Sequence, residues 1–409
     1  MSVITIFSGS FCKEDLVIRD VLVKTGYKLV TDMEIVAEAS RFSGIAEAKI
    51  SQTFWTKTSV FNKFTHEKEH SIAHLRLAIA EMLSGDNLLI SGFSSQLIPK
   101  EVSHVLRICL IADIKFRILE GTKEHGMHEK DILKLIQKND GDRAVWISTL
   151  FQKKDPWDSE LYDMVIPVDK TSVEEIAALI KKNADIDVVR PTDRSKNAVE
   201  DFLLGAKVGV ALANEGHNVN VKAKDRAITL TINKHVLMLS RLEEELKSIA
   251  GKVPGVKSVE TRVGADFYQT DVYRKYDFEM PSRVLLVDDE REFVQALSER
   301  LLIRDMGSTV AYDGESALSL IKEDEPEVMI LDLKMPGIDG IEVLRRVKET
   351  NPEIEVIILT GHGSEEDKRV CMDLGAFAYL HKPVDIDVLS ETLKKANEKV
   401  KRKKDQIKH

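Results

Sequence analysis

The feature that most constrains the fold is an apolar run, Val328-Met-Ile-Leu331, followed at once by Asp332 and a Pro- and Gly-containing loop that reaches Gly340. A short continuous apolar run of this kind is typical of a strand that is buried on both faces of a parallel sheet. Ligands of open α/β sheets bind beyond the carboxyl ends of the strands, where Asp332 lies. The stretch therefore predicts a candidate nucleophile or metal ligand at a strand end.

The region from Arg283 to Lys399 repeats the order strand, loop, helix, which predicts a doubly wound α/β sheet of the flavodoxin-like type. Strands are predicted at Val284–Val287, Ser308–Ala311, Val328–Leu331, Val356–Leu359 and Ala378–Leu380. Helices are predicted to begin near Glu292, Glu315, Ile341, Glu365 and Val384.

Polar side chains stand at the predicted strand ends: Asp288, Asp289, Asp332, Thr360 and Lys382. Clustered carboxylates repel one another unless a cation is bound, and hard oxygen ligands suit Mg²⁺. In that setting Asp332 is a nucleophile for phosphate, Thr360 a hydroxyl donor and Lys382 an ammonium partner. Taken alone, these residues have plainer interpretations: Asp288-Asp289 as a helix cap, Thr360 as part of a turn, and Lys382 as a solvated lysine.

This domain resembles a response-regulator receiver domain, through the residues above, Leu333-Lys-Met-Pro-Gly-Ile-Asp-Gly340 and Gly375-Ala376. The resemblance implies that Asp332 is the phosphoacceptor and that Asp288, Asp289, Asp332 and the backbone carbonyl of Lys334 hold the metal. It further implies that Thr360 is the switch hydroxyl, Tyr379 the switch aromatic and Lys382 the phosphate partner, before a cis peptide to Pro383. A sensor histidine kinase, a phosphotransfer protein or a small phosphodonor would then phosphorylate Asp332, and the changed face would control the upstream domains or a partner.

Length and composition fit a soluble, multidomain, cytoplasmic protein. The chain has 409 residues, a net charge of −9, and three cysteines without a CxxC pair. This length exceeds one ordinary core, and the cysteine pattern excludes a disulfide framework or a cysteine zinc site. The beginning of the chain shows no basic-then-apolar leader, and no apolar stretch reaches the roughly 20 residues that cross a bilayer.

The first 184 residues predict a parallel, three-layer α/β domain. Strands are predicted at Val3–Phe7, 87–92, 105–112 and Met164–Val168, with helices at Leu16–Val23, 67–83 and Val173–Ile180. The turn Ser8-Gly-Ser-Phe-Cys-Lys13 lies where a phosphate loop would lie, but the motif GxxxxGK[ST] is incomplete. Glu14 places a carboxylate where phosphate would dock.

This region resembles the cytidylate-kinase-like family of phosphate-loop kinases, through Leu89-Ile-Ser-Gly92, Ala112-Asp-Ile-Lys-Phe-Arg117, Asn139-Asp-Gly-Asp-Arg-Ala-Val-Trp146 and Ser159-Glu-Leu-Tyr-Asp163. The resemblance implies nucleotide-binding roles for Gly9, Lys13, Arg117 and Arg143, with Asp142 and Arg143 in a lid-like segment facing phosphates. Three interpretations stay open: an active nucleotide kinase, a degenerate sensing or docking domain, and a structural domain.

The middle of the chain predicts a small α+β domain. Its elements are a helix at Val199–Ala213, a hairpin at 218–232, a helix at Leu237–Ile249 and a strand that ends at Val263. With Pro254-Gly-Val-Lys-Ser-Val259 it resembles the BON domain, which implies protein or membrane-surface contacts without catalysis. A third functional hypothesis is a scaffold that uses this domain to reach a membrane surface or a partner, and of these two we expect the protein partner.

The expected organisation is a cytidylate-kinase-like domain at 1–184, a linker at 185–196, a BON-like domain at 197–265, a linker at 266–282, a receiver at 283–399 and a basic tail at 400–409. The leading functional hypothesis is phosphorelay signalling through Asp332, and the alternative is a nucleotide kinase gated by the receiver. The acidic balance and the absence of a helix-turn-helix after the receiver predict that the chain does not bind DNA directly.

Overall fold

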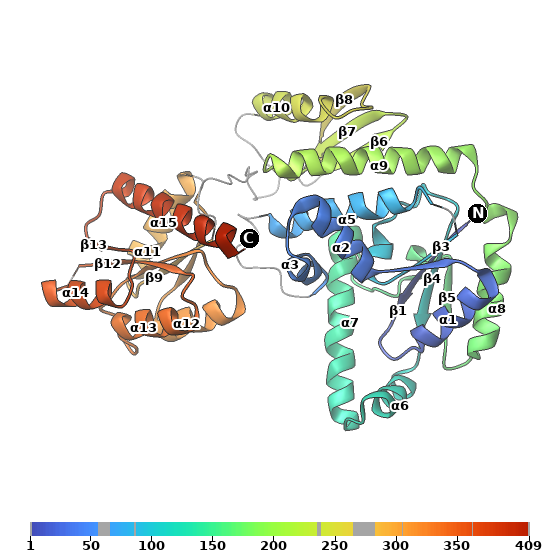
Figure 1. Cartoon of the computed structure of the whole chain (residues 1–409), viewed down its shortest axis with the longest axis horizontal. Coiled ribbons are helices and arrows are strands. Elements are labelled where there is room, and N and C mark those ends of the chain that lie inside the picture. The colour runs from blue at the N-terminus through green and yellow to red at the C-terminus, as the bar shows by residue number, and fades with distance from the viewer. Residues whose placement is uncertain are drawn as a thin grey trace. The chain divides into compact units, whose positions relative to one another are not determined.

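A computed structural model describes residues 2–55, 66–85, 87–234, 239–264, 283–304, 306–361 and 363–407 (Figure 1). The chain divides into two compact units. One unit contains the N-terminal and middle modules and the other contains the C-terminal module, and each is described by itself. The predicted linker at 266–282 lies outside the described residues.

The N-terminal module is built on a five-stranded parallel sheet in the order β2-β3-β1-β4-β5. The strands are β1 Val3–Ser8, β2 Lys28–Thr31, β3 Leu88–Ser91, β4 Val105–Ile111 and β5 Met164–Pro167. The helices are α1 Glu14–Thr25, α2 Asp32–Ser43, α3 Glu47–Ser51, α5 Glu67–Met82, α6 Ile114–His125, α7 Glu129–Phe151 and α8 Val173–Ala184, with short 3-10 turns at Gln52–Phe54, Phe93–Leu97, Ser159–Leu161 and Asp187–Val189.

Both faces of this sheet are covered, which explains why β1 is buried along its whole length. Ile4 and Ile6 point into a core with α1 and α8, whereas Val3 and Phe7 point into a second core with α2, α5 and α7. This alternation follows from the period of two along a strand. The prediction of a parallel three-layer α/β domain is confirmed. The strand β2, at the edge of the sheet, was not predicted, because only one of its four residues is buried and its apolar pattern is weak.

The middle module has a three-stranded sheet in the order β6-β7-β8, with one antiparallel and one parallel pair. Its elements are α9 Asp193–Asn214, β6 Asn220–Lys224, β7 Ala227–Ile232, α10 Leu239–Gly251 and β8 Ser258–Val263. The helix α9 begins six residues before the predicted Val199, so the expected linker at 185–196 is wrong at its end. The hydroxyl of the fully buried Ser195 accepts a bond from the Thr192 amide (2.9 Å) and lies 2.9 Å from His104 Nδ1, which orders this part of the chain.

The C-terminal module is a second five-stranded parallel sheet, in the order β10-β9-β11-β12-β13. The strands are β9 Val284–Val287, β10 Ser308–Ala311, β11 Val328–Leu331, β12 Glu355–Thr360 and β13 Ala378–His381. The helices are α11 Arg291–Ile303, α12 Gly314–Glu323, α13 Gly340–Thr350, α14 Glu365–Asp373 and α15 Ile386–Ile407. One core contains α12, α13 and α14, and the other contains α11 and α15. The predicted flavodoxin-like alternation is confirmed.

The expected basic tail at 400–409 is wrong in one respect, because α15 continues to Ile407. Val400 is buried. The carboxylate of the fully buried Glu355 forms ion pairs with Lys399 (3.1 Å) and Lys403 (3.0 Å). A buried carboxylate needs such partners. The lysines that a sequence pattern places in a solvated end therefore fix the last turns of the helix.

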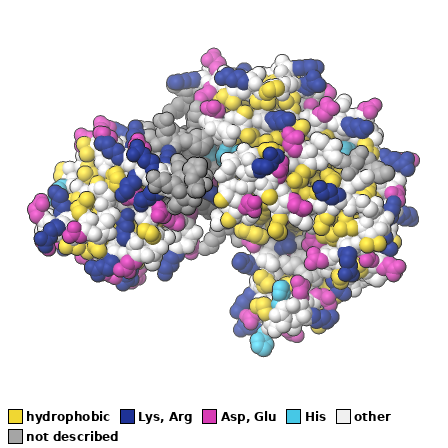
Figure 2. Space-filling view, viewed as in Figure 1, with side chains coloured by type: hydrophobic (Ala, Val, Ile, Leu, Met, Phe, Trp, Pro, Cys, Tyr) yellow, Lys and Arg dark blue, Asp and Glu magenta, His cyan; other side chains and the backbone are white. Residues whose placement is uncertain are grey.

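Charged side chains of both signs are interspersed over the face shown in Figure 2. Within the described ranges, every helix is too short or too polar to cross a bilayer.

Candidate functional site

The acidic site is built at the carboxyl end of β9, whose four residues are all buried. The chain leaves the sheet at Asp288, and the Glu290 amide donates to Asp288 Oδ1 (3.0 Å) as α11 begins. Asp288 is only 5% exposed, and Asp289 is the more exposed of the two. Burial raises the pKa of the Asp288 carboxyl, although its bond with Lys382 acts in the opposite direction.

Asp332 reaches the same place because β11 pairs with β9 in register, Leu331 opposite Val287. The Asp332 amide donates to the Val287 carbonyl (2.9 Å), and Asp332 Oδ1 accepts from the Leu333 amide (2.8 Å). A Cβ atom at Gly340 would collide with the Asp332 carbonyl oxygen, so only glycine lets α13 start this close to the strand end. The loop and its glycine therefore hold the backbone of Asp332 in place.

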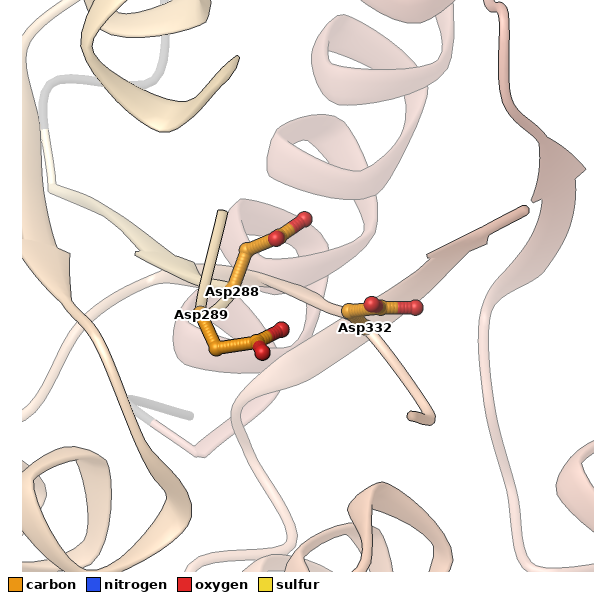
Figure 3. Close-up of side chains that lie close together, drawn as sticks. All are labelled: Asp288, Asp289 and Asp332. Carbon is orange, nitrogen blue, oxygen red and sulfur yellow. The ribbon is translucent and has the colours of Figure 1, made fainter. Parts of the chain in front are cut away.

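Asp288, Asp289 and Asp332 form one cluster of carboxylates (Figure 3). One carboxylate oxygen from each lies within 4.8 Å of the other two. Oxygen donors of this kind, gathered at a sheet edge, fit a hard divalent cation that keeps part of its water shell. This cluster is typical of the Mg²⁺ site of receiver domains.

Lys382 reaches the cluster from the end of β13, and its peptide bond to Pro383 is cis, as predicted. Its Nζ atom lies 2.6 Å from Asp288 Oδ2, 3.0 Å from Glu290 Oε1 and 3.5 Å from Asp332 Oδ2. Burial opposes the charged form of Lys382, but its bonds to Asp288 and Glu290 prevail and raise its pKa. Glu290 was not predicted as part of the site; its place directly after Asp288-Asp289 was the available signal.

The other residues that the resemblance assigns lie on the neighbouring strands and loops. Thr360 ends β12 and is fully buried, and its carbonyl accepts from the Lys382 amide (2.9 Å). Tyr379, on β13, has a buried hydroxyl that occupies the place a side chain at Gly363 would need. Lys334 follows Asp332 by two residues, with an exposed side chain. The fold thus brings Thr360 and Lys382 to the edge of the sheet that carries the acidic cluster.

Comparison with known proteins gives the identity of both α/β modules. Residues 284–394 match the response regulator receiver domain, and residues 3–170 match the cytidylate kinase-like family. The C-terminal module is a response regulator receiver domain. The N-terminal module is a cytidylate kinase-like domain, and both predicted resemblances are confirmed. The BON-like character of the middle module stays a prediction.

Individual relatives match through the receiver domain. Response regulator MprA of Mycolicibacterium vanbaalenii is 36% identical over 110 residues, which are 27% of this chain and 48% of that protein. Sporulation initiation phosphotransferase F of Bacillus subtilis is 34% identical over 116 residues, which are 28% of this chain and 94% of that protein. The structure of the Francisella response regulator 1452 receiver domain has 34% identity, covers 30% of this chain and 98% of that one, and gives a TM-score of 0.28. This chain therefore spans about half the length of MprA but nearly all of the Bacillus subtilis relative.

The second candidate site is the loop between β1 and α1 of the kinase-like domain. Two non-glycine residues, Phe11 (φ 62°) and Lys13 (φ 52°), adopt the left-handed conformation that favours glycine. Lys13 Nζ lies 3.7 Å from Glu120 and 5.0 Å from the centre of the Phe116 ring. A Cβ atom at Gly9 would lie 3.2 Å from Cys12 Sγ and 3.5 Å from the Arg117 guanidinium.

Two arginines donate into this loop. Arg143 Nε donates to the Ser8 carbonyl (2.6 Å), and Arg117 Nε donates to the Ser10 carbonyl (2.8 Å). Arg117 also makes two parallel bonds to Asp140, of 2.7 and 2.9 Å. The loop therefore presents carbonyl oxygens to guanidinium groups, whereas a phosphate cradle presents backbone N–H groups to an anion.

The lid-like segment expected around Asp142 and Arg143 lies within the 23-residue helix α7, and Asp142 is buried. At the start of α1, Glu14 accepts a bond from Ser91, and burial raises its pKa. Asp32 accepts from the Phe93 and Ser94 amides (2.8 Å each), and burial raises its pKa as well. The structure thus brings Gly9, Arg117 and Arg143 together around a loop whose helix begins with an acidic residue.

Proposed function

We propose that this protein is a cytoplasmic two-component signalling protein whose receiver domain accepts a phosphoryl group on Asp332 from a histidine kinase or a phosphotransfer protein. The observation that carries the proposal is the convergence of Asp288, Asp289, Asp332 and Lys382 at one sheet edge. In that cluster, a nucleophilic carboxylate lies beside both a cation site and an ammonium group.

In the proposed reaction, a carboxylate oxygen of Asp332 attacks the phosphorus of a phosphohistidine. The P–N bond breaks as the P–O bond forms, and the electron pair stays on the imidazole nitrogen, which takes a proton from water. Mg²⁺ held by Asp288, Asp289, Asp332 and the Lys334 carbonyl would offset the charge on the phosphoryl oxygens. The Lys382 ammonium and the Thr360 hydroxyl would each bind one of those oxygens.

The proposed response is a population shift. Drawing Thr360 towards the phosphoryl group changes the space beside Tyr379, whose hydroxyl is packed at Gly363. A ligand shifts a two-state equilibrium only by its differential contacts, and the phosphoryl group supplies contacts that one state lacks. The surface around α14 and β13 would then change its affinity for the other modules or for a protein partner. We propose the BON-like middle module as a protein-interaction module in this output.

The decisive experiment is labelling with radioactive acetyl phosphate in the presence of Mg²⁺. Wild-type protein should be labelled, and Asp332→Ala should carry no label, because the attacking carboxylate is gone. Asp339→Ala is a matched control, since the Asp339 carboxylate caps α13 by accepting a bond from the Ile341 amide (2.8 Å). Equal labelling of wild type and Asp332→Ala would reject the assignment.

The kinase-like domain supports a second candidate function, a nucleotide kinase gated by the receiver, through its family match at residues 3–170. The contacts of its loop argue for a sensing or docking role instead, because Arg117 and Arg143 bind the loop carbonyls and Glu14 opens α1. An anion at that place would meet carbonyl oxygens and a carboxylate. Calorimetric titration with nucleotides, with and without Mg²⁺, separates these functions.

A further inference from the structure

The ammonium group of Lys382 is shared between the acidic cluster and a residue outside it, Glu290. We propose, on the basis of the phosphoryl transfer proposed above, that Glu290 is a positioning residue that holds Lys382 away from Asp332. In this role it slows the phosphorylation of Asp332 and shortens the life of the aspartyl phosphate.

The distances carry this proposal. Lys382 Nζ lies within hydrogen-bond range of Asp288 Oδ2 (2.6 Å) and Glu290 Oε1 (3.0 Å), but 3.5 Å from Asp332 Oδ2. The residue that would partner the phosphoryl group is therefore bound more closely to two other carboxylates than to the phosphoacceptor. Most N–H···O hydrogen bonds of proteins have a donor–acceptor distance of about 2.7–3.2 Å, so the distance to Asp332 lies outside the usual range.

The two competing carboxylates differ in what they can do. Asp288 is 5% exposed and also accepts the Glu290 amide, so it is fixed as a part of the metal cluster. The side chain of Glu290 is 65% exposed, so it can leave Lys382 without losing burial. The ammonium also lies 4.4 Å from the centre of the Phe293 ring, beside which it can turn between its partners.

A phosphoryl group on Asp332 carries up to two negative charges, so it binds the Lys382 ammonium more strongly than the unmodified Asp332 carboxylate does. To reach it, Lys382 must give up Glu290. Since the Glu290 side chain is largely exposed, its ion pair with Lys382 has only a modest free energy. We therefore expect removal of the Glu290 carboxylate to speed phosphorylation about two- to fivefold and to lengthen the life of the phosphorylated state by a similar factor.

The test compares wild type with Glu290→Gln in the full chain, at saturating Mg²⁺ so that changes in metal affinity do not enter. Two quantities are measured: the rate of labelling by radioactive acetyl phosphate, and the rate of label loss after the donor is removed. Glu292→Gln is the matched control, because it removes the same charge from an exposed position on α11. Glu290→Asp keeps the carboxylate and should stay within about twofold of wild type in both rates.

The outcomes are separable. Faster labelling and slower loss in Glu290→Gln alone support the proposal. Faster labelling in both glutamine variants, with unchanged label loss, would mean that lower negative charge only attracts the anionic donor, and would overturn it. Wild-type rates in Glu290→Gln would overturn it as well. A wild-type protein that takes no label on Asp332 would instead remove the proposed function itself.

Discussion

The two five-stranded parallel sheets have similar architectures and opposite chemistry at the carboxyl end of their first strand. After β1, Arg117 and Arg143 donate hydrogen bonds to carbonyl groups of the loop, and Arg117 also forms an ion pair with Asp140. After β9, the Lys382 ammonium lies 3.5 Å or less from three carboxylates, those of Asp288, Glu290 and Asp332, and Asp289 belongs to the same acidic cluster. The first site is filled by the protein's own cations, and the second retains negative charge that favours an added cation. A sheet edge thus supplies a place for chemistry, and the local charge balance decides whether a ligand can use it.

The largest expected effect is on the stability of the filled site. Arg117→Ala removes a guanidinium that is 8% exposed and leaves Asp140, 26% exposed, and the Ser10 carbonyl without it. We expect the free energy of unfolding of this module to fall by about 2–3 kcal/mol, somewhat below the loss for a fully buried pair. Urea unfolding followed by tryptophan fluorescence measures it, because Trp55, Trp146 and Trp157 all belong to this module.

The control is Arg190→Ala, which breaks a pair with Asp187 in which both side chains are largely exposed. It should leave the unfolding midpoint unchanged. If Arg117→Ala lowered the free energy of unfolding no more than this control, the arginine contacts would not stabilise the loop after β1. The contrast between that loop and the acidic cluster after β9 would then weaken.

A metal titration tests the acidic cluster of the receiver domain, Asp288, Asp289 and Asp332. Mg²⁺ at about 100 times its dissociation constant should stabilise the receiver by about 2.7 kcal/mol, because it binds only the folded cluster. Scanning calorimetry reports the receiver, and tryptophan fluorescence should show no matching shift in the kinase-like module. Asp288→Asn should abolish the stabilisation. Equal stabilisation of both modules would indicate a nonspecific effect of Mg²⁺.

The pH dependence of the metal-free receiver should show a smaller effect. Burial raises the pKa of Asp288 above its ordinary value of 3.8, so the folded state binds this proton more tightly than the unfolded state. The contribution of this group to stability should therefore grow as the pH falls through its folded pKa, and be complete below 3.8. Asp288→Asn should remove that part of the pH profile in chemical unfolding. A contribution that instead grew with rising pH would mean that Lys382, and not burial, dominates at Asp288.

The smallest expected effect is the heat of nucleotide binding. Titration of ATP or CMP into the protein should give no measurable heat, because an entering phosphate would have to displace Arg117 and Arg143 from the loop carbonyls. The positive control is Mg²⁺ titrated into the same sample, which should bind at the receiver. Saturable heat with a nucleotide would break the comparison and restore the kinase alternative.

Much of the receiver could be predicted from sequence because its information is local. Val284–Val287 and Val328–Leu331 have the predicted bounds, since strands buried on both faces are continuous apolar runs. Ser308–Ala311, an edge strand with two half-buried residues, also has its predicted bounds. The polar residues of its site stand at the ends of those runs, and a parallel sheet brings such ends to one edge. The edge strand β2, which is largely uncovered, lacks that signal.

The sequence by itself determined which strands are buried and which polar residues follow them, because both depend on neighbours along the chain. The tertiary structure alone decided that Glu290 shares Lys382, that Glu355 anchors the end of α15, and that Arg117 and Arg143 fill the incomplete phosphate loop. These contacts join residues 44 to 135 positions apart. Their partners are set by how helices and strands pack, and no local periodicity encodes that packing.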